Sequence, residues 1–346
     1  MKRLLRRLIP VLLLAAAFSC SGYEKLDLAD PAPVAILSDP PPGKARADRV
    51  VIISIDGLRP DAIEAAGAET VKKLIERGAS CARAETIRPS ITLPSHTSML
   101  TGLDYSRHHV GWNTYRAGYI VHPTVFSVLS QVGKKSAMIF SKEKFHFLAN
   151  PKCVSWIYGP PTPAKVPVAE DDCEVEELKR SLKSDATAAP PTRGDATTTA
   201  DMIARAFAAA WPVQQWPLTF VHFREADEAG HSRGWMSPEY IEAVKRIDRA
   251  LSILVASIDQ AGGFEKTALI LTADHGGSDR GHYRWASPDK PENVTIPWVC
   301  VGPGIRAGMK IDRMIRTFDT APTALALIGL GAPEGIDGQV VHEVLK

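Results

Sequence analysis

Apolar segments about as long as a β-strand recur along this chain, and they are continuous rather than alternating. A strand with one buried face alternates apolar and polar side chains, whereas a strand covered on both faces is apolar throughout, as in parallel sheets. Helical patterns lie between these segments, which predicts a doubly wound, mostly parallel α/β sheet with helices on both faces. The expected strands are Val50–Ile55, Ser136–Ser141, Leu218–Phe223, Ala268–Ala273 and Trp298–Val301, and the expected helices are Pro60–Gly78, Thr124–Val132, Thr198–Ala210, Pro238–Gln260 and Thr320–Ile328.

The length of 346 residues suits one large α/β domain with an insertion, or two smaller domains. We expect residues 49–142 and 196–346 to form the α/β core. Residues 143–195 break the alternation of strands and helices, since they contain Gly159-Pro160-Pro161 and Pro190-Pro191. Long irregular insertions often act as lids, so this segment is predicted to be a cap over a site, although a surface excursion without function has nearly equal support.

Residues 1–20 combine a basic start, a short apolar stretch and small residues, which is typical of a secretory signal peptide. Cys20 follows Ala17-Phe18-Ser19, which is similar to a bacterial lipobox, so lipidation of Cys20 is favoured over plain cleavage nearby. Residues 21–48 are rich in proline and are predicted to form an extended tether. The protein is therefore expected to be exported to the periplasm and anchored to a bacterial membrane as a lipoprotein.

The charge of the chain argues against binding to a nucleic-acid polymer. The formal net charge is +2, but four positive residues of the predicted leader contribute to it, and removing them leaves about −2. Those residues are Lys2, Arg3, Arg6 and Arg7.

Four cysteines remain beyond Cys20. Cys153 and Cys173 flank a polar, proline-rich stretch and could form a disulfide in an oxidising compartment. Cys81 and Cys300 lie beside apolar segments and are expected to be buried free thiols.

Acidic and imidazole side chains directly follow two of the expected strands. Asp56 comes after the first strand, and Asp274 and His275 come after the fourth. Because ligands bind beyond the carboxyl ends of parallel strands, these side chains should meet at one edge of the sheet. On its own, Asp56 would also fit an Asx turn before Gly57.

A second group of possible ligands lies on other segments. Asp227 and His231 are four residues apart, so both can face one metal ion from a single helical turn or from a compact loop. His282 follows His275 by seven residues, although a lone histidine is more often a hydrogen-bonded surface or core residue. Mixed carboxylate and imidazole ligands suit zinc, which predicts a two-metal hydrolase.

Thr92 is the candidate nucleophile. Pro94 fits the first turn of a helix that continues through Leu100, which puts the Thr92 hydroxyl at a helix N-terminus. Free N–H groups and the helix dipole favour an alkoxide and a bound phosphate there. The alternative is that Thr92 is only an N-cap.

Taken together, these segments resemble the alkaline phosphatase superfamily, and within it the type I phosphodiesterase and nucleotide pyrophosphatase group. The likeness covers roughly residues 50–115 and 215–305, and it implies two zinc ions. It implies that Thr92 is the nucleophile and that Asn113 donates to a phosphoryl oxygen, although Asn113 also fits a turn before Thr114. The implied ligands are Asp56, Thr92, Asp274 and His275 for one zinc, and Asp227, His231 and His282 for the other.

The substrate is less constrained by the resemblance. Members that take nucleotides often carry an aromatic residue after the threonine, whereas this chain has Leu93, which offers contact area without a π face. Lys142 and Lys144 alternate along an extended segment and could both face the site, as a similar pair does in phosphonoacetate hydrolases. Two solvated lysines are the alternative.

We therefore expect a zinc-dependent phosphohydrolase that cleaves a small phosphorylated substrate through a phospho-threonine intermediate. A phosphomonoesterase or phosphonate hydrolase that uses Lys142 and Lys144 is an alternative. A phosphoryl or phosphoethanolamine transferase and a non-catalytic, anion-binding lipoprotein are further alternatives.

Overall fold

The computed structural model describes residues 34–35, 37, 44–162, 198–283 and 290–345. They form one eight-stranded sheet with the order β4-β3-β5-β1-β6-β7-β2-β8. The strands are β1 (Arg49–Ile55), β2 (Ala79–Glu85), β3 (Ser136–Ile139), β4 (Trp156–Tyr158), β5 (Leu218–Phe223), β6 (Thr267–Thr272), β7 (Thr295–Val301) and β8 (Met309–Lys310).

Parallel pairing dominates the sheet and confirms the predicted fold class. Strand β1 lies between β5 and β6 and is parallel to both, and β3 is parallel to β5 and to β4. Strand β7 is antiparallel to its neighbours β6 and β2. Every residue of β5 and β6 is buried, which explains why these segments are apolar throughout.

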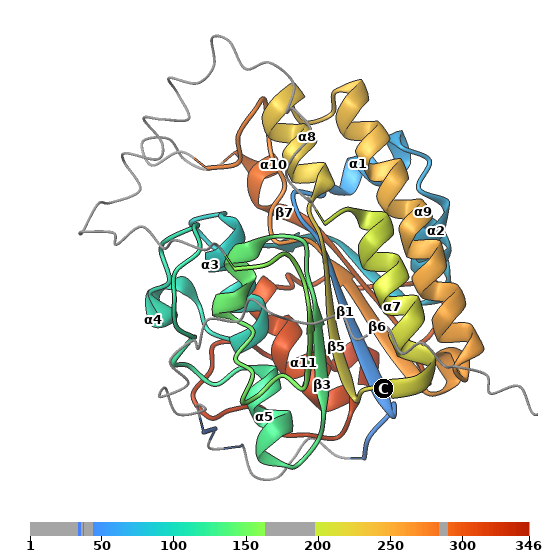
Figure 1. Ribbon diagram of the computed structural model, residues 1–346. Helices are drawn as coiled ribbons and strands as arrows, with labels where there is room; N and C mark the ends of the chain where they lie inside the picture. Colours follow the sequence, from blue (N-terminus) through green and yellow to red (C-terminus); the bar gives the residue numbers. More distant parts are fainter. Residues whose placement is uncertain (1–33, 36, 38–43, 163–197, 284–289, 346) are drawn as a thin grey trace, which may run out of the picture.

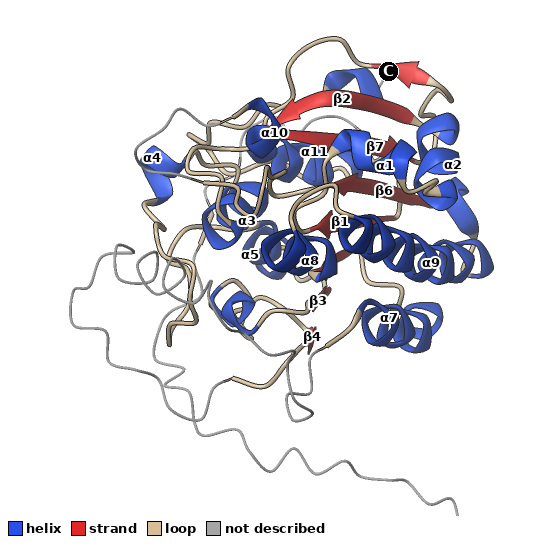
Figure 2. Ribbon diagram, turned by 90° about the horizontal axis from the view of Figure 1, so that it is seen from above, coloured by secondary structure: helices blue, strands red, loops and turns tan. Residues whose placement is uncertain are grey.

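Helices cover both faces of the sheet, as Figures 1 and 2 show: α2, α7 and α9 lie on one face, and α3, α5 and α11 lie on the other. Side chains cap several of them; Thr124 caps α5 through a capping box, and Ser237 caps α9. The helices are α1 (Pro60–Ala65), α2 (Glu69–Arg77), α3 (Thr92–Thr101), α4 (Tyr105–His108), α5 (Val125–Gln131), α7 (Ala200–Gln214), α8 (Glu225–Arg233), α9 (Pro238–Gln260), α10 (Pro291–Val294) and α11 (Thr320–Leu327), with short 3₁₀ turns η1 (Glu143–Phe147), η3 (Gly263–Glu265), η4 (Thr317–Asp319) and η5 (His342–Leu345).

Two expected boundaries are wrong. The helix expected over Pro60–Gly78 is two helices, because the chain turns at Gly67, whose φ is +57°. The segment expected to be a cap begins too early at residue 143. Phe145 and Phe147 are buried in the core and Trp156–Tyr158 pairs with β3, so residues up to 158 belong to the α/β core. Residues 163–195 of the expected cap lie outside the described residues.

The described part of the expected tether packs against the domain rather than extending from it. The backbone of Ala35 exchanges two hydrogen bonds with the Gln131 side chain, and Ala47 is buried and donates its N–H to the Leu327 carbonyl. The expected signal peptide and Cys20 lie outside the described residues. Among the helices that the structure describes, none combines the length and apolarity needed to cross a membrane.

The cysteines partly follow the expectation. Cys81 and Cys300 are buried free thiols, which confirms the prediction for these two. Cys153 is also a buried free thiol in the described part of the chain, whereas Cys173 lies outside it, so their pairing stays a prediction.

Candidate metal and phosphoryl-transfer site

The predicted ligands come from three neighbouring strands at one edge of the sheet. Asp56 follows β1, Asp274 and His275 follow β6, and Asp227 lies on α8, just beyond β5. Gly57 allows α8 to approach β1: its φ is +72°, and a Cβ there would lie 2.9 Å from the Asp227 Cα. The Asp227 N–H donates to the Asp56 carbonyl at 3.0 Å, which fixes the two acids relative to each other.

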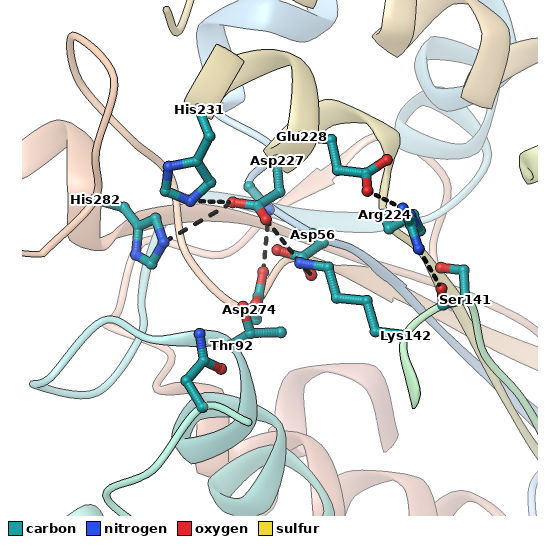
Figure 3. A network of polar contacts seen from close by, with 12 residues as sticks. Asp56, Thr92, Ser141, Lys142, Arg224, Asp227, Glu228, His231, Asp274 and His282 are labelled. Carbon is teal, nitrogen blue, oxygen red and sulfur yellow. Dashed lines mark hydrogen bonds and ion pairs between the residues drawn. The ribbon is translucent and has the colours of Figure 1, made fainter. Parts of the chain in front are cut away.

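These residues form two overlapping clusters, each with ligand atoms within 4.8 Å of one another. Asp56, Asp274 and His275 make the first cluster, and Asp227, His275 and His282 make the second. His231 lies next to the second cluster, with its Nε2 3.3 Å from Asp227 Oδ1. Figure 3 shows Asp56, Asp227, His231, Asp274 and His282 gathered in one place.

Four atoms at the centre of the clusters are buried and have no hydrogen-bond partner among the described residues. Buried polar groups nearly always have a partner, so a group of unpartnered ones that face each other is unusual. All four are electron-pair donors suited to a divalent cation of zinc type, so the residues present fit such an ion. The atoms are Asp56 Oδ1, Asp227 Oδ1, Asp274 Oδ2 and His275 Nε2.

The three histidines hold their rings by the nitrogen that points away from the clusters. The Nδ1–H of His275 donates to the Gly276 carbonyl at 2.8 Å, and that of His282 donates to the Ser90 carbonyl at 2.5 Å. The Nδ1–H of His231 donates to the Arg280 carbonyl at 3.2 Å. Since a carbonyl can only accept, each Nδ1 carries a proton, and a neutral ring then offers the lone pair of its Nε2 to a metal. Against the opposing effect of burial, the negative charge of Asp227 raises the pKa of His231, so a metal at this position would displace a proton.

Asp274 is held in a similar way. Its Oδ1 accepts from the backbone N–H of Gly57 at 3.1 Å and from that of His275 at 2.9 Å, which leaves Oδ2 free. Burial, together with the negative charge of Asp56, raises the pKa of Asp274 well above its usual range. A metal-free site is therefore electrostatically costly.

His222 belongs to the site but was not predicted. It is fully buried at the end of β5, its Nε2 is 3.0 Å from Asp56 Oδ2, and its Nδ1 is 3.0 Å from Ser141 Oγ. Burial lowers the pKa of His222 to about 4, so the neutral ring donates Nε2–H to Asp56. The available signal was a polar residue inside the apolar run Leu218–Phe223, which needs a buried partner.

His96 was also missed as part of the site. Its Nδ1–H donates to the Thr92 carbonyl at 2.7 Å and lies 3.5 Å from Asp274 Oδ2, and its Nε2 accepts from Ser54 Oγ at 2.8 Å. Burial lowers the pKa of His96 well below its usual value. This neutral ring therefore fixes the first turn of α3 beside the Asp274 carboxylate.

Thr92 is the first residue of α3, and Ile91 rather than Thr92 is the N-cap. The Thr92 hydroxyl makes no hydrogen bond within the described ranges, so it is not used to cap the helix. Asn113 lies next to it, because Asn113 Oδ1 accepts from the Leu93 N–H at 3.1 Å. The Leu93 N–H is therefore already occupied, and donation by the Asn113 amide nitrogen to a phosphoryl oxygen stays a prediction.

Two expected substrate contacts are placed differently. Leu93 is fully buried in the hydrophobic core, so it offers no surface to a substrate, contrary to the expectation. Lys142 is only 8% exposed, and its Nζ lies 2.6 Å from Asp56 Oδ2 and 2.7 Å from Asp227 Oδ2. Figure 3 shows the ammonium between the two acids, so Lys142 is not the solvated lysine of the alternative, and its contact with a substrate stays a prediction.

The negative charges around the Lys142 ammonium explain why this buried side chain stays protonated. Burial alone would lower the pKa of Lys142, but the negative charges of Asp227 and Asp56 outweigh burial and raise the pKa.

The surroundings of Lys144 differ from those of Lys142. It is partly buried and forms no hydrogen bond or ion pair with any described residue, and burial together with the Lys142 charge lowers the pKa of Lys144 to about 8.

Residues 50–287 match the model of the family described as type I phosphodiesterase / nucleotide pyrophosphatase. The chain is 23% identical over 343 residues to GPI ethanolamine phosphate transferase 1 of Aspergillus fumigatus, which covers 88% of this chain and 29% of that protein. It is 33% identical over 136 residues to 2,3-bisphosphoglycerate-independent phosphoglycerate mutase of Synechococcus elongatus, which covers 36% of this chain and 24% of that protein. The chain thus spans less than a third of the length of these relatives.

Solved structures share the fold. The alkaline phosphatase PafA matches with a TM-score of 0.63 at 14% identity, covering 88% of this chain and 100% of that one. Murine ectonucleotide pyrophosphatase / phosphodiesterase 5 matches with a TM-score of 0.58 at 12% identity, covering 86% and 98%. The family match spans most of the chain, so this protein belongs to the type I phosphodiesterase / nucleotide pyrophosphatase family, which supports phosphoester hydrolysis or transfer as its chemistry.

Proposed function

We propose that the protein is a zinc-dependent enzyme that hydrolyses phosphate esters through a phospho-threonine intermediate on Thr92. The observation that carries this proposal is the group of four buried, unpartnered ligand atoms close to the N-terminus of α3. Family membership supports it, as does the fold shared with murine ectonucleotide pyrophosphatase / phosphodiesterase 5, whose structure is a complex with AMP.

Two zinc ions fit the donor set. Asp56, Asp274 and His275, with the Thr92 hydroxyl, would hold one ion, and Asp227, His231 and His282 would hold the other. His275 lies within reach of both clusters, and the family resemblance assigns it to the first. When bound, the metal ions would lower the pKa of a hydroxyl or water and offset the negative charge of a phosphoryl group.

The residues of the chain supply the nucleophile and its orientation. The Thr92 hydroxyl would lose its proton to water and its oxygen would attack phosphorus. The bond to the ester oxygen would break, the alcohol would leave after taking up a proton, and the phosphoryl group would stay on Thr92. Water would then attack phosphorus and release Thr92. The Asn113 amide would donate to a non-bridging oxygen in both steps, because its own oxygen is held by the Leu93 N–H.

Replacing Thr92 tests the proposal. Parent protein should contain about two zinc ions per chain, by the donor set above, and should hydrolyse p-nitrophenyl phosphate or its bis ester. Thr92→Ala should lower kcat by about 10³-fold or more while keeping most of the metal. Thr97→Ala is the matched control, because Thr97 lies on the same helix and its hydroxyl only donates to the Leu93 carbonyl. Full turnover by Thr92→Ala would exclude it as the nucleophile, and metal without turnover on any ester would favour the non-catalytic, anion-binding alternative.

The choice between diester and monoester depends on Lys144. A partly buried ammonium that forms no ion pair with a described residue favours a substrate with an additional negative charge, such as a phosphomonoester or a small phosphonate. Lys144→Ala should raise KM for p-nitrophenyl phosphate much more than for the bis ester. Lys135→Ala is the control, because Lys135 is exposed at the opposite end of β3. Equal effects of Lys144→Ala on both esters would exclude this role.

Transfer to an alcohol is a second candidate, favoured by the likeness to GPI ethanolamine phosphate transferase 1 over 88% of the chain. An assay with added acceptor alcohols separates the two reactions. A transferase should form the new phosphoester faster than inorganic phosphate, whereas a hydrolase should release mainly phosphate.

We also propose that the protein is exported and held at a bacterial membrane by a lipid on Cys20. The sequence of residues 1–20 supports this proposal. Full-length protein should incorporate labelled fatty acid and fractionate with membranes, and Cys20→Ser should do neither. Label on the Cys20→Ser protein would exclude this anchor.

A further inference from the structure

Asp56 and Asp227 divide their oxygens in the same way. In each, Oδ2 accepts from the Lys142 ammonium, at 2.6 Å for Asp56 and 2.7 Å for Asp227. In each, Oδ1 is buried and without a hydrogen-bond partner. The two acids belong to different clusters, so one lysine contacts both clusters, in each case at the carboxylate oxygen other than the unpartnered one.

Hydrogen bonds of the backbone around Lys142 fix the position of its ammonium. Lys142 follows β3 in an extended conformation and its carbonyl accepts from the Phe145 N–H that begins η1. The preceding Ser141 carbonyl accepts from Arg224 Nη1 at 3.1 Å. Hydrogen bonds therefore hold the backbone at Ser141 and at Lys142, which places the Lys142 ammonium beside the two acids.

The charge balance makes this contact important. Asp56, Asp227 and Asp274 are three buried carboxylates within one small volume, and the neighbouring His222 and His96 rings are neutral. Lys142 is the one lysine or arginine paired with these acids among the described residues. Removing one partner from a buried ion pair leaves an uncompensated charge, which is strongly destabilising.

We propose that Lys142 is a positioning residue that ties a carboxylate of one metal site to a carboxylate of the other and keeps each a single-oxygen ligand. This inference rests on the proposed function, because it takes the two clusters as the metal sites. Among the described residues Lys142 pairs with the Oδ2 atoms, which leaves the Oδ1 atoms open to cations while the ammonium is in place.

The first test is thermal unfolding of the metal-free protein. Lys142→Met keeps the length of the side chain and removes the charge, and it should lower the Tm by about 5 °C or more. Lys142→Gln keeps an N–H donor and should fall between parent and Lys142→Met. Lys144→Met is the matched control, and its Tm should stay within about 2 °C of the parent, because Lys144 pairs with no described residue.

The second test is the visible spectrum of the Co²⁺-loaded protein, which reports coordination number rather than stability. Without Lys142, each Oδ2 is free to bind as well, so Lys142→Met should gain ligands and show weaker d–d absorption per cobalt than the parent. Lys142→Gln should show a smaller change in the same direction, and Lys144→Met should match the parent.

The outcomes separate this inference from the proposed function. A parent protein that binds no cobalt overturns both. A parent that binds about two cobalt ions per chain, with Lys142→Met indistinguishable from it in Tm and in spectrum, overturns only the role of Lys142. A Lys142→Met protein that is recovered only when zinc is present during expression supports the inference, because cations then replace the missing charge.

Discussion

The two carboxylate oxygens of Asp56 have different surroundings. Its Oδ2 accepts from His222 and pairs with Lys142, and its Oδ1 is unpartnered. Hydrogen bonds of this kind orient a carboxylate and tune its affinity for a metal. At the residue scale, therefore, the site depends on the neighbours that hold its ligands as well as on the ligands themselves.

His222 offers the clearest test at this scale. His222→Leu fills the same buried space but removes the Nε2–H that Asp56 accepts, so zinc affinity should fall by about 10- to 100-fold. His222→Gln keeps an N–H donor and should recover part of the loss. Competition with a chromophoric zinc chelator measures both, and unchanged affinity in His222→Leu would show that Asp56 is oriented without it.

The burial of Lys142 and of Leu93 could not be predicted from the sequence. Lys142 looks like an exposed lysine after a strand, and its burial depends on α8 coming close to β1. Leu93 looks available to a substrate, yet the packing of α3 buries it completely. In both cases tertiary packing decides an exposure that local sequence does not encode.

At the scale of elements, the ends of the strands position the side chains of the candidate site. Strands β5, β1 and β6 are adjacent and parallel, so their carboxyl ends bring His222, Asp56 and Asp274 together. Continuous apolar runs predicted these strands well. Strand β2 was missed, because Ala79–Glu85 is mixed in character and three of its seven residues are buried. Strand β4 was missed because it is short and lies in the expected cap.

Gly57 tests the contact between β1 and α8. Gly57→Ala would strain a φ of +72° and push a Cβ to 2.9 Å from Asp227 Cα, so it should separate Asp227 from Asp56 and reduce metal content. Gly67→Ala is the matched control, because its φ is +57° but nothing lies within 4 Å. It should cost only the left-handed strain, about 1–2 kcal/mol, and keep the metal. Urea unfolding and metal analysis measure both, and equal losses in the two variants would contradict the close-contact argument.

At the scale of the whole molecule, three buried carboxylates sit where the central strands end, so metal binding should be coupled to folding. When the free concentration of an ion is 1,000 times its Kd, binding adds about 4 kcal/mol to the free energy of unfolding.

The fold and the order of the motifs could be predicted, because the hydrophobic pattern and the motif order can both be read from a single sequence. The Lys142 bridge and the packed tether were not, since both depend on contacts between distant segments.

Chelation tests this coupling. Removing metal from the parent protein should lower its Tm by several degrees, and adding zinc back should restore it. Asp274→Asn weakens a ligand and should show a smaller difference between the chelated and the zinc-loaded protein. A parent Tm that does not change on chelation and reloading would show that the clusters hold no stabilising ion.

The central claim, that the Thr92 oxygen attacks phosphorus, is tested most directly by the stereochemistry of the reaction. A substrate made chiral at phosphorus with sulfur and oxygen isotopes reports how many displacements occur, because each in-line attack inverts the centre. Two successive displacements, first by Thr92 and then by water, predict net retention of configuration. Net inversion would mean that water attacks the substrate directly, and it would contradict the account.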